Sequence, residues 1–205
     1  MRHRFVLLAF GPLLLTVNSF SAIRDNTKSA DSRTIDARQY CATVSNTSKV
    51  SKKHIFADVA EAEVPKWEKF ANDTSLSNAL GERTPSAVAL VWFRNGKIVE
   101  ANFSFQSESN DWAKYSDHCF RPDGTLALVR STLKTFHGSA SEITLSIYDK
   151  RGSVIKTTVE YRDLNTGRPA RRPDDFQEEK TPVYTKTSDL PFIGLVDDIP
   201  GHIGP

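Results

Sequence analysis

Three stretches within residues 86–162 decide the fold: Phe93-Arg94-Asn95-Gly96-Lys97-Ile98, Phe120-Arg121-Pro122-Asp123-Gly124-Thr125-Leu126 and Tyr148-Asp149-Lys150-Arg151-Gly152-Ser153-Val154. Each has an aromatic residue, a polar turn closed by glycine, one polar residue and then an aliphatic residue. This pattern is typical of a tight turn between two antiparallel strands. The three stretches therefore predict a β-meander, but they specify no reaction.

The turn residues also predict the loop lengths. Asn95-Gly96 suits a two-residue type I′ loop because both residues accept a positive φ. The other two turns fit three-residue loops that end in glycine, Pro122-Asp123-Gly124 and Lys150-Arg151-Gly152.

These loops set the predicted register of each hairpin. In the first, the pairs are Arg94 with Lys97, Trp92 with Val99, Leu90 with Ala101, and Val88 with Phe103. In the third, the pairs are Ile147 with Ile155, Leu145 with Thr157, and Ile143 with Val159. In the middle hairpin, Phe120 and His118 share a face with Leu126 and Leu128, while Cys119 lies on the other face with Ala127 and Val129.

The residues before the meander predict helices. From His54 to Glu63, apolar residues recur at helical spacing, and Pro65 favours an end near Glu63. A second, short helix is expected from a cap at Asp73 or Thr74 through Leu80, with Gly81 ending it.

The two ends of the chain have a different composition. Residues 1–21 resemble a signal peptide, with a basic start, an apolar stretch too short to span a bilayer and small residues before Ala22. Residues 22–39 are polar and predict a disordered linker, and residues 163–205 predict a proline-containing flexible tail. Residues 190–205 regain some apolar side chains, which leaves a docking segment as the alternative. Residues 40–162 then form a single domain.

We therefore expect an α+β fold, with one or two N-terminal helices packed on a curved antiparallel meander of five to six strands. Cystatin-like and NTF2-like folds share this order of a helix followed by a meander, and the analogy is at the level of the fold alone.

Cys41 and Cys119 are the only two cysteines. The leader would deliver them to an oxidising compartment, so a disulfide is expected between them. Closing that loop would stabilise the fold by roughly 4 kcal/mol. The alternatives are two buried thiols or a metal site. Metal binding by His118 with Cys119 is disfavoured because neighbours on a strand point to opposite faces.

The middle hairpin and the loop before it hold the candidate binding residues Asp111, Trp112, Tyr115 and His118. Together they could line an aromatic and acidic pocket with one titratable imidazole. The simpler interpretation is that His118 is a core residue with one hydrogen bond. No catalytic residue, metal ligand or cofactor is predicted, because the sequence has no nucleotide-binding glycine-rich loop, no zinc-protease motif and no nucleophile elbow.

These features favour a secreted or periplasmic binding or interaction module over an enzyme. The full chain has a formal charge of +2, and removing the two leader arginines leaves the mature chain close to neutral. That charge disfavours nucleic acid as a partner, which leaves an unknown protein or small molecule. No membrane span is expected after leader removal. The alternatives are a small exported enzyme with a pocket around His118, or an envelope component that docks through its C-terminal tail.

Overall fold

The computed structural model describes residues 30–60 and 64–196 of the chain. The expected leader and residues 22–29 lie outside these ranges. The described helices are α1 (Ala30–Ser48), α2 (Asp73–Leu80) and the short 3₁₀ helices η1 (His137–Ser139), η2 (Thr187–Asp189) and η3 (Ile193–Leu195). The strands are β1 (His54–Asp58), β2 (Trp67–Phe70), β3 (Ala87–Arg94), β4 (Lys97–Gln106), β5 (Trp112–Phe120), β6 (Leu126–Thr135), β7 (Ala140–Tyr148), β8 (Val154–Asp163) and β9 (Pro169–Ala170).

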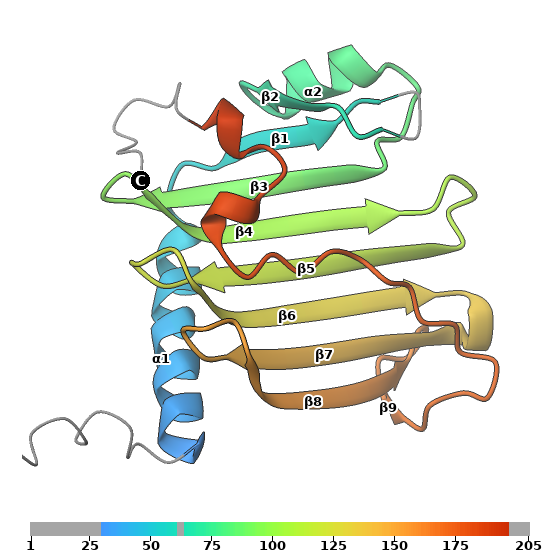
Figure 1. Ribbon diagram of the computed structural model, residues 1–205. Coiled ribbons are helices and arrows are strands. Elements are labelled where there is room, and N and C mark those ends of the chain that lie inside the picture. Colours follow the sequence, from blue (N-terminus) through green and yellow to red (C-terminus); the bar gives the residue numbers. More distant parts are fainter. Residues whose placement is uncertain (1–29, 61–63, 197–205) are drawn as a thin grey trace, which may run out of the picture.

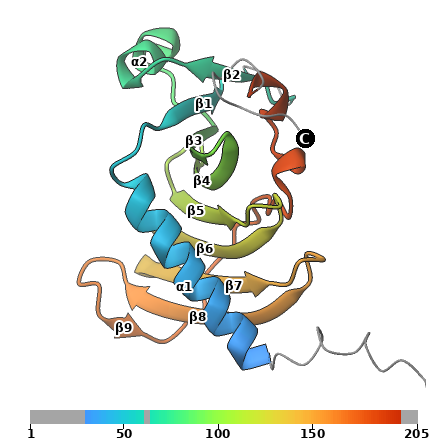
Figure 2. The same ribbon diagram turned by 90° about the vertical axis from the view of Figure 1, so that its left-hand side faces the viewer.

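All nine strands form one antiparallel sheet in the order β2-β1-β3-β4-β5-β6-β7-β8-β9 (Figure 1). The α+β class and the meander are therefore confirmed, but the expected count of five to six strands is wrong. The NTF2-like order is not supported either, because two strands precede the meander. The sheet is curved, with α1 on one side and the C-terminal segment on the opposite side (Figure 2). We call the side that carries α1 the helix face. We call the C-terminal segment, residues 176–196, the strap, and the side that it crosses the strap face.

All three expected turns form as predicted. Arg94 pairs with Lys97 across Asn95-Gly96, and the two three-residue loops close through hydrogen bonds from Arg121 N to Thr125 O (2.8 Å) and from Asp149 N to Ser153 O (2.9 Å).

Beyond each turn, however, the predicted register is wrong by one residue. Counted from the turn, a β-bulge follows the second residue pair of every hairpin, with Val99, Ala127 and Ile155 as the extra residues. Trp92 therefore lies opposite Glu100, and Ile147 opposite Lys156. In the middle hairpin, the bulge interrupts the alternation of side chains: Ala127 and Leu128 both pack on the helix face, so Leu126 and Val129, three residues apart, share the core on the opposite face.

Helix α1 includes residues 30–39, for which the composition predicted disorder. Its buried positions are small and recur at spacings of three and four: Thr34, Ala37, Cys41, Val44 and Ser48. This stripe packs on the helix face, where Val44 and Cys41 contact Val99, Cys119 and Ala127. Small side chains let the helix lie close to the sheet, and they also conceal its amphipathic character from a search for large apolar residues.

Strand β1 lies where the apolar spacing predicted a helix, so that prediction is wrong. Ile55, Phe56 and Ala57 are all at most 1% exposed, as in a strand buried on both faces. Pairing with β2 on one side and β3 on the other overrides the local pattern, since a short apolar run fits either structure. The expected helix end at Glu63 lies outside the described residues.

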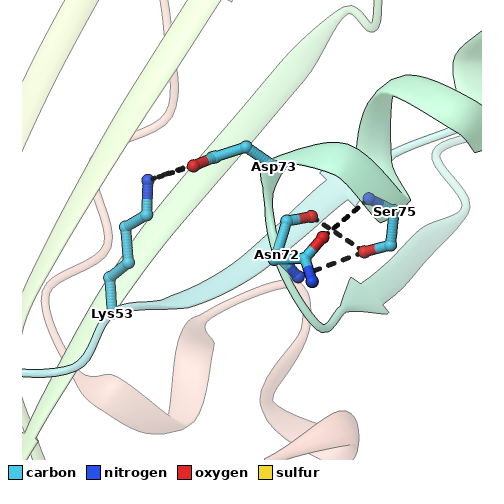
Figure 3. A network of polar contacts seen from close by, with 4 residues as sticks. All are labelled: Lys53, Asn72, Asp73 and Ser75. Atoms are coloured by element: carbon cyan, nitrogen blue, oxygen red, sulfur yellow. Dashed lines mark hydrogen bonds and ion pairs between the residues drawn. The ribbon is translucent and has the colours of Figure 1, made fainter.

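Helix α2 forms over the predicted residues and ends at Gly81, whose φ is +60°. Its cap is Asn72 and not Asp73 or Thr74. Asn72 and Ser75 form a reciprocal capping box, with Ser75 N donating to Asn72 Oδ1 at 2.8 Å and Asn72 N donating to Ser75 Oγ at 3.1 Å (Figure 3). Asp73 instead forms an ion pair with Lys53 at 2.9 Å, which ties the helix to the segment before β1.

Residues 176–196 form a strap across the strap face, so the expectation of a flexible tail from residue 163 does not hold for this segment. Leu190, Phe192 and Val196 are at most 2% exposed and belong to the main core. The ring of Phe192 stacks on Phe56 with centroids 4.4 Å apart. Backbone bonds hold the strap to the middle hairpin, among them Leu126 N to Thr185 O at 2.8 Å. The strap was missed because its apolar residues follow neither a helical nor a strand period.

Candidate functional site

His118, the expected centre of the site, is completely buried on the strap face. The backbone N–H of Tyr184 donates to its Nε2 at 3.4 Å, and its Nδ1 lies 3.4 Å from Ser116 O. The rings of Phe103 and Tyr184 pack against it with centroids 5.2 and 5.8 Å away. Burial lowers the pKa of His118 to about 4, so the imidazole is neutral at pH 7. His118 is a core residue in this arrangement, with the strap between it and solvent.

Tyr115 lies on the helix face, because residues 115 and 118 alternate to opposite sides of β5. Its side chain is 42% exposed, and the ammonium group of Lys134 lies 5.7 Å from the ring centroid. The structure therefore does not bring Tyr115 and His118 together.

Asp111 and Trp112 line a shallow hollow of about 430 Å³ at the far end of the sheet from α1, beside Phe136 and Leu164. The Asp111 carboxylate accepts a hydrogen bond from Ser109 Oγ at 2.6 Å and so helps to fix its own loop. Trp112 packs on the small core formed by Leu133, Ala140 and Phe176. Of the four predicted residues, Asp111 and Trp112 share this hollow, and Tyr115 and His118 do not line it.

The disulfide between Cys41 and Cys119 is confirmed. It joins the middle of α1 to β5 across the helix face, and both residues are at most 7% exposed. One residue before Cys41, the hydroxyl of Tyr40 donates to Phe120 O at 2.9 Å. The helix is thus fixed to the end of the middle hairpin by one covalent bond and one hydrogen bond.

A hollow larger than the one beside Asp111 lies next to this junction. It has a volume of about 710 Å³ and lies between α1 and the turns that follow β5 and β7. We call it the helix–hairpin cleft. Its charged lining residues are Arg33, Asp36, Arg121, Asp149, Lys150 and Arg151, and its other lining residues are Ala37, Tyr40, Pro122 and Ile155.

The charged groups of the cleft are partly fixed by the fold. Arg121 donates to the carbonyl oxygens of Leu126 and Tyr148 and so bridges two hairpins. Asp149 Oδ1 accepts from Arg151 N and Ser153 N at 2.8 and 2.9 Å. The hydrogen bond from the Ser153 backbone is the main reason why the pKa of Asp149 is lowered.

Sequence reasoning missed this cleft because it joins three segments far apart in the chain. One signal was present in the sequence. Four residues that precede Cys41 are spaced by three and four positions, as on one face of a helix: Arg33, Asp36, Ala37 and Tyr40. Residues 22–39 were expected to be disordered, so this spacing was not considered.

Two half-buried carboxylates, Glu100 and Asp117, lie on the helix face near the C-terminal end of α1. Burial raises the pKa of both carboxyl groups. A hydrogen bond from Ser48 partly offsets this rise at Glu100, and a hydrogen bond from Asn102 does so at Asp117. Among the described residues, Glu100 Oε2 has no hydrogen-bond partner. These groups favour the protonated form more than an exposed acid does.

Comparisons with protein-family models, with curated proteins and with solved structures found no match. In residues 30–60 and 64–196, no three His, Cys, Asp or Glu side chains gather in a way that could hold a metal ion. Neither α1 nor any other helix of this part of the chain combines the length and apolar character needed to cross a membrane.

Proposed function

We propose that this protein is an exported, non-enzymatic binding module whose ligand occupies the helix–hairpin cleft. The observation that carries this proposal is the cleft itself: an open hollow of about 710 Å³ with charged and apolar walls. Its volume lies within the range of about 300–1,000 Å³ that is usual for small-molecule sites. The Cys41–Cys119 bond also joins α1, which forms one wall, covalently to the sheet beside the cleft.

The burial of His118 favours a binding module over an enzyme built around that residue. A general base must reach within hydrogen-bond distance of the proton that it abstracts. The strap lies over His118, and the Tyr184 N–H occupies its Nε2. A pKa of about 4 also leaves it a weak base.

The position of the strap disfavours the alternative of an envelope component that docks through its C-terminal tail. Leu190, Phe192 and Val196 fill the core of this domain and are not available to a partner. Truncation after Asp163 would therefore expose the core, and it would not isolate a docking function.

Export is part of the proposal and rests on the leader-like residues 1–21 together with the disulfide. A disulfide persists in the periplasm or outside the cell and is rare in the cytosol.

The test is a ligand-observed NMR screen of the mature chain, residues 22–205, with fragments of negative, neutral and positive charge. Each hit is measured again on Asp36→Trp, which places a large ring in the cleft from the exposed side of α1. Gln39→Trp is the matched control, because Gln39 is exposed on the same helix but does not line the cleft. We expect at least a tenfold loss of affinity in Asp36→Trp alone. Hits that bind both variants equally would contradict the proposal.

A further inference from the structure

The helix–hairpin cleft carries an excess of positive charge in a chain that is otherwise close to neutral. Four cations and two carboxylates line it, which leaves a net charge of +2 at this one place. The cations come from three segments: Arg33 from α1, Arg121 from the turn after β5, and Lys150 and Arg151 from the turn after β7. A concave surface lined by one sign of charge concentrates ligands of the opposite sign.

Within the described part of the chain, three of these cations make no direct side-chain bond, although Arg33 and Arg151 interact electrostatically with Asp149, and Lys150 with Asp123. Among the described residues, the side chains of Arg33, Lys150 and Arg151 form no ion pair and no hydrogen bond. All three are exposed at the rim of the cleft. Their charges therefore remain available to a ligand.

Arg121 differs from these three cations because it is half-buried. Burial lowers the pKa of its guanidinium group, but an arginine stays charged in proteins. Its two bonds to carbonyl oxygens fix it between two hairpins. The cleft thus has one half-buried cation held by the fold and three exposed ones.

The remaining lining residues give the cleft an apolar side. Ala37 and Tyr40 lie on α1, Pro122 lies in the turn after β5, and Ile155 is the bulge residue of β8. Burial raises the pKa of Tyr40, so its hydroxyl is neutral at pH 7 and adds no negative charge. A ligand that matches the cleft combines an anionic group with an apolar body.

We infer that the helix–hairpin cleft binds a small amphipathic anion, in which a phosphate or carboxylate contacts Arg33, Lys150 and Arg151 and an apolar part contacts Tyr40 and Ile155. This inference rests on the proposed binding function and adds the class of ligand. Phosphate and carboxylate share the chemistry that guanidinium groups recognise, a pair of acceptor oxygens in one plane.

The test uses four probes with related bodies: octyl phosphate, octanoate, octanol and octyltrimethylammonium, each below its micellar concentration. Binding to the mature chain is measured by isothermal titration calorimetry. We expect octyl phosphate and octanoate to bind at least tenfold more tightly than octanol, and octyltrimethylammonium to bind most weakly. Inorganic phosphate alone should bind weakly because it lacks the apolar part.

Charge reversal locates the site. Arg33→Glu with Arg151→Glu should weaken octyl phosphate at least tenfold and strengthen octyltrimethylammonium. The matched control, Arg168→Glu with Arg171→Glu, makes the same change in net charge at exposed positions outside the cleft and should leave both affinities unchanged. Circular dichroism establishes that each variant is folded.

Three results would overturn the inference: equal affinity for the anionic and cationic probes, no binding of the anions, or binding of octyl phosphate that survives charge reversal. The proposed function fails on a different result. If octanol or a neutral fragment binds and Asp36→Trp abolishes that binding, the cleft is still a binding site and only the anionic ligand class is wrong.

Discussion

Replacing the two cysteines tests how α1 is held to the sheet. The double variant Cys41→Ala, Cys119→Ala removes a bond with a sequence separation of 78 residues. On the chain-entropy relation, a closed loop of this length stabilises the folded state by about 4.5 kcal/mol at 25 °C. Because small domains unfold with about 5–15 kcal/mol, this loss takes a large share of the total.

The measurement is urea denaturation at pH 7 without reductant, followed by tryptophan fluorescence. We expect the free energy of unfolding to fall by about 3–5 kcal/mol relative to wild type. Wild type treated with reductant should lose a similar amount, which controls for the change of side chain. A loss below about 1 kcal/mol in both samples would refute the reasoning, since it would mean that the unfolded chain gains little freedom without the bond.

Hydrogen exchange locates the effect. Without the bond, α1 is held by a stripe of small residues and by the hydrogen bond from Tyr40 to Phe120 O. Small side chains bury little apolar area, so the packing of α1 contributes little free energy. We therefore expect the amides of α1 to exchange faster than those of β4 and β5 in the double variant.

Three further changes test the strap, the buried histidine and the helix cap. Phe192→Ala should destabilise the fold by about 3–5 kcal/mol, because it removes a core ring that stacks on Phe56. Phe136→Ala is the control and should change stability little, since Phe136 is 70% exposed. Thermal unfolding compares the two variants, and equal shifts of the midpoint would contradict the role of the strap. The pKa of His118, lowered to about 4, lies below its ordinary value of 6.5, so the unfolded chain takes up the proton first as the pH falls. The neutral His118 should therefore contribute its full stabilisation above pH 6.5. Between pH 6.5 and 4, the free energy of unfolding of wild type, measured by urea denaturation, should fall by up to about 3 kcal/mol relative to His118→Gln. Parallel pH profiles of the two proteins would show that His118 is not buried as described. Asn72→Ala should cost about 1 kcal/mol through loss of the α2 capping box, and Thr74→Ala is the control in the same helix, expected to change the unfolding midpoint little.

Local turn chemistry was the most predictable part of the fold. Asn95-Gly96 and the two three-residue loops specify their turns by backbone conformation alone, so the first pair of each hairpin formed as expected. The bulges were not predictable from alternation. Strands such as β3 carry apolar residues on both faces, so a shift of one residue keeps apolar side chains in the core under either register.

Tertiary contacts decided the elements that were missed. Ile55 to Ala57 became a strand because β2 and β3 pair with it on both sides. The apolar side chains after residue 190 were visible in the sequence, but they follow no period that specifies a structure. In the fold, Phe192 packs against Phe56, Trp67 and Phe103.

The expectation that the four candidate residues line one pocket was not met, for a related reason. Asp111, Trp112, Tyr115 and His118 are close in sequence, but a strand sends alternate residues to opposite faces. Tyr115 and His118 were therefore separated by the sheet. The cleft instead joins Arg33, Arg121 and Arg151, which come from three segments brought together by the tertiary fold and by the disulfide, and sequence spacing does not encode this proximity.

The most direct test of the proposed binding site is an NMR titration of isotope-labelled mature chain with octyl phosphate or with any hit from the fragment screen. We predict that the backbone shifts that change most lie at Arg33, Tyr40, Lys150, Arg151 and Ile155, around the helix–hairpin cleft. Shifts that gather instead at the hollow beside Asp111, Trp112 and Phe136, with the cleft unchanged, would contradict the account.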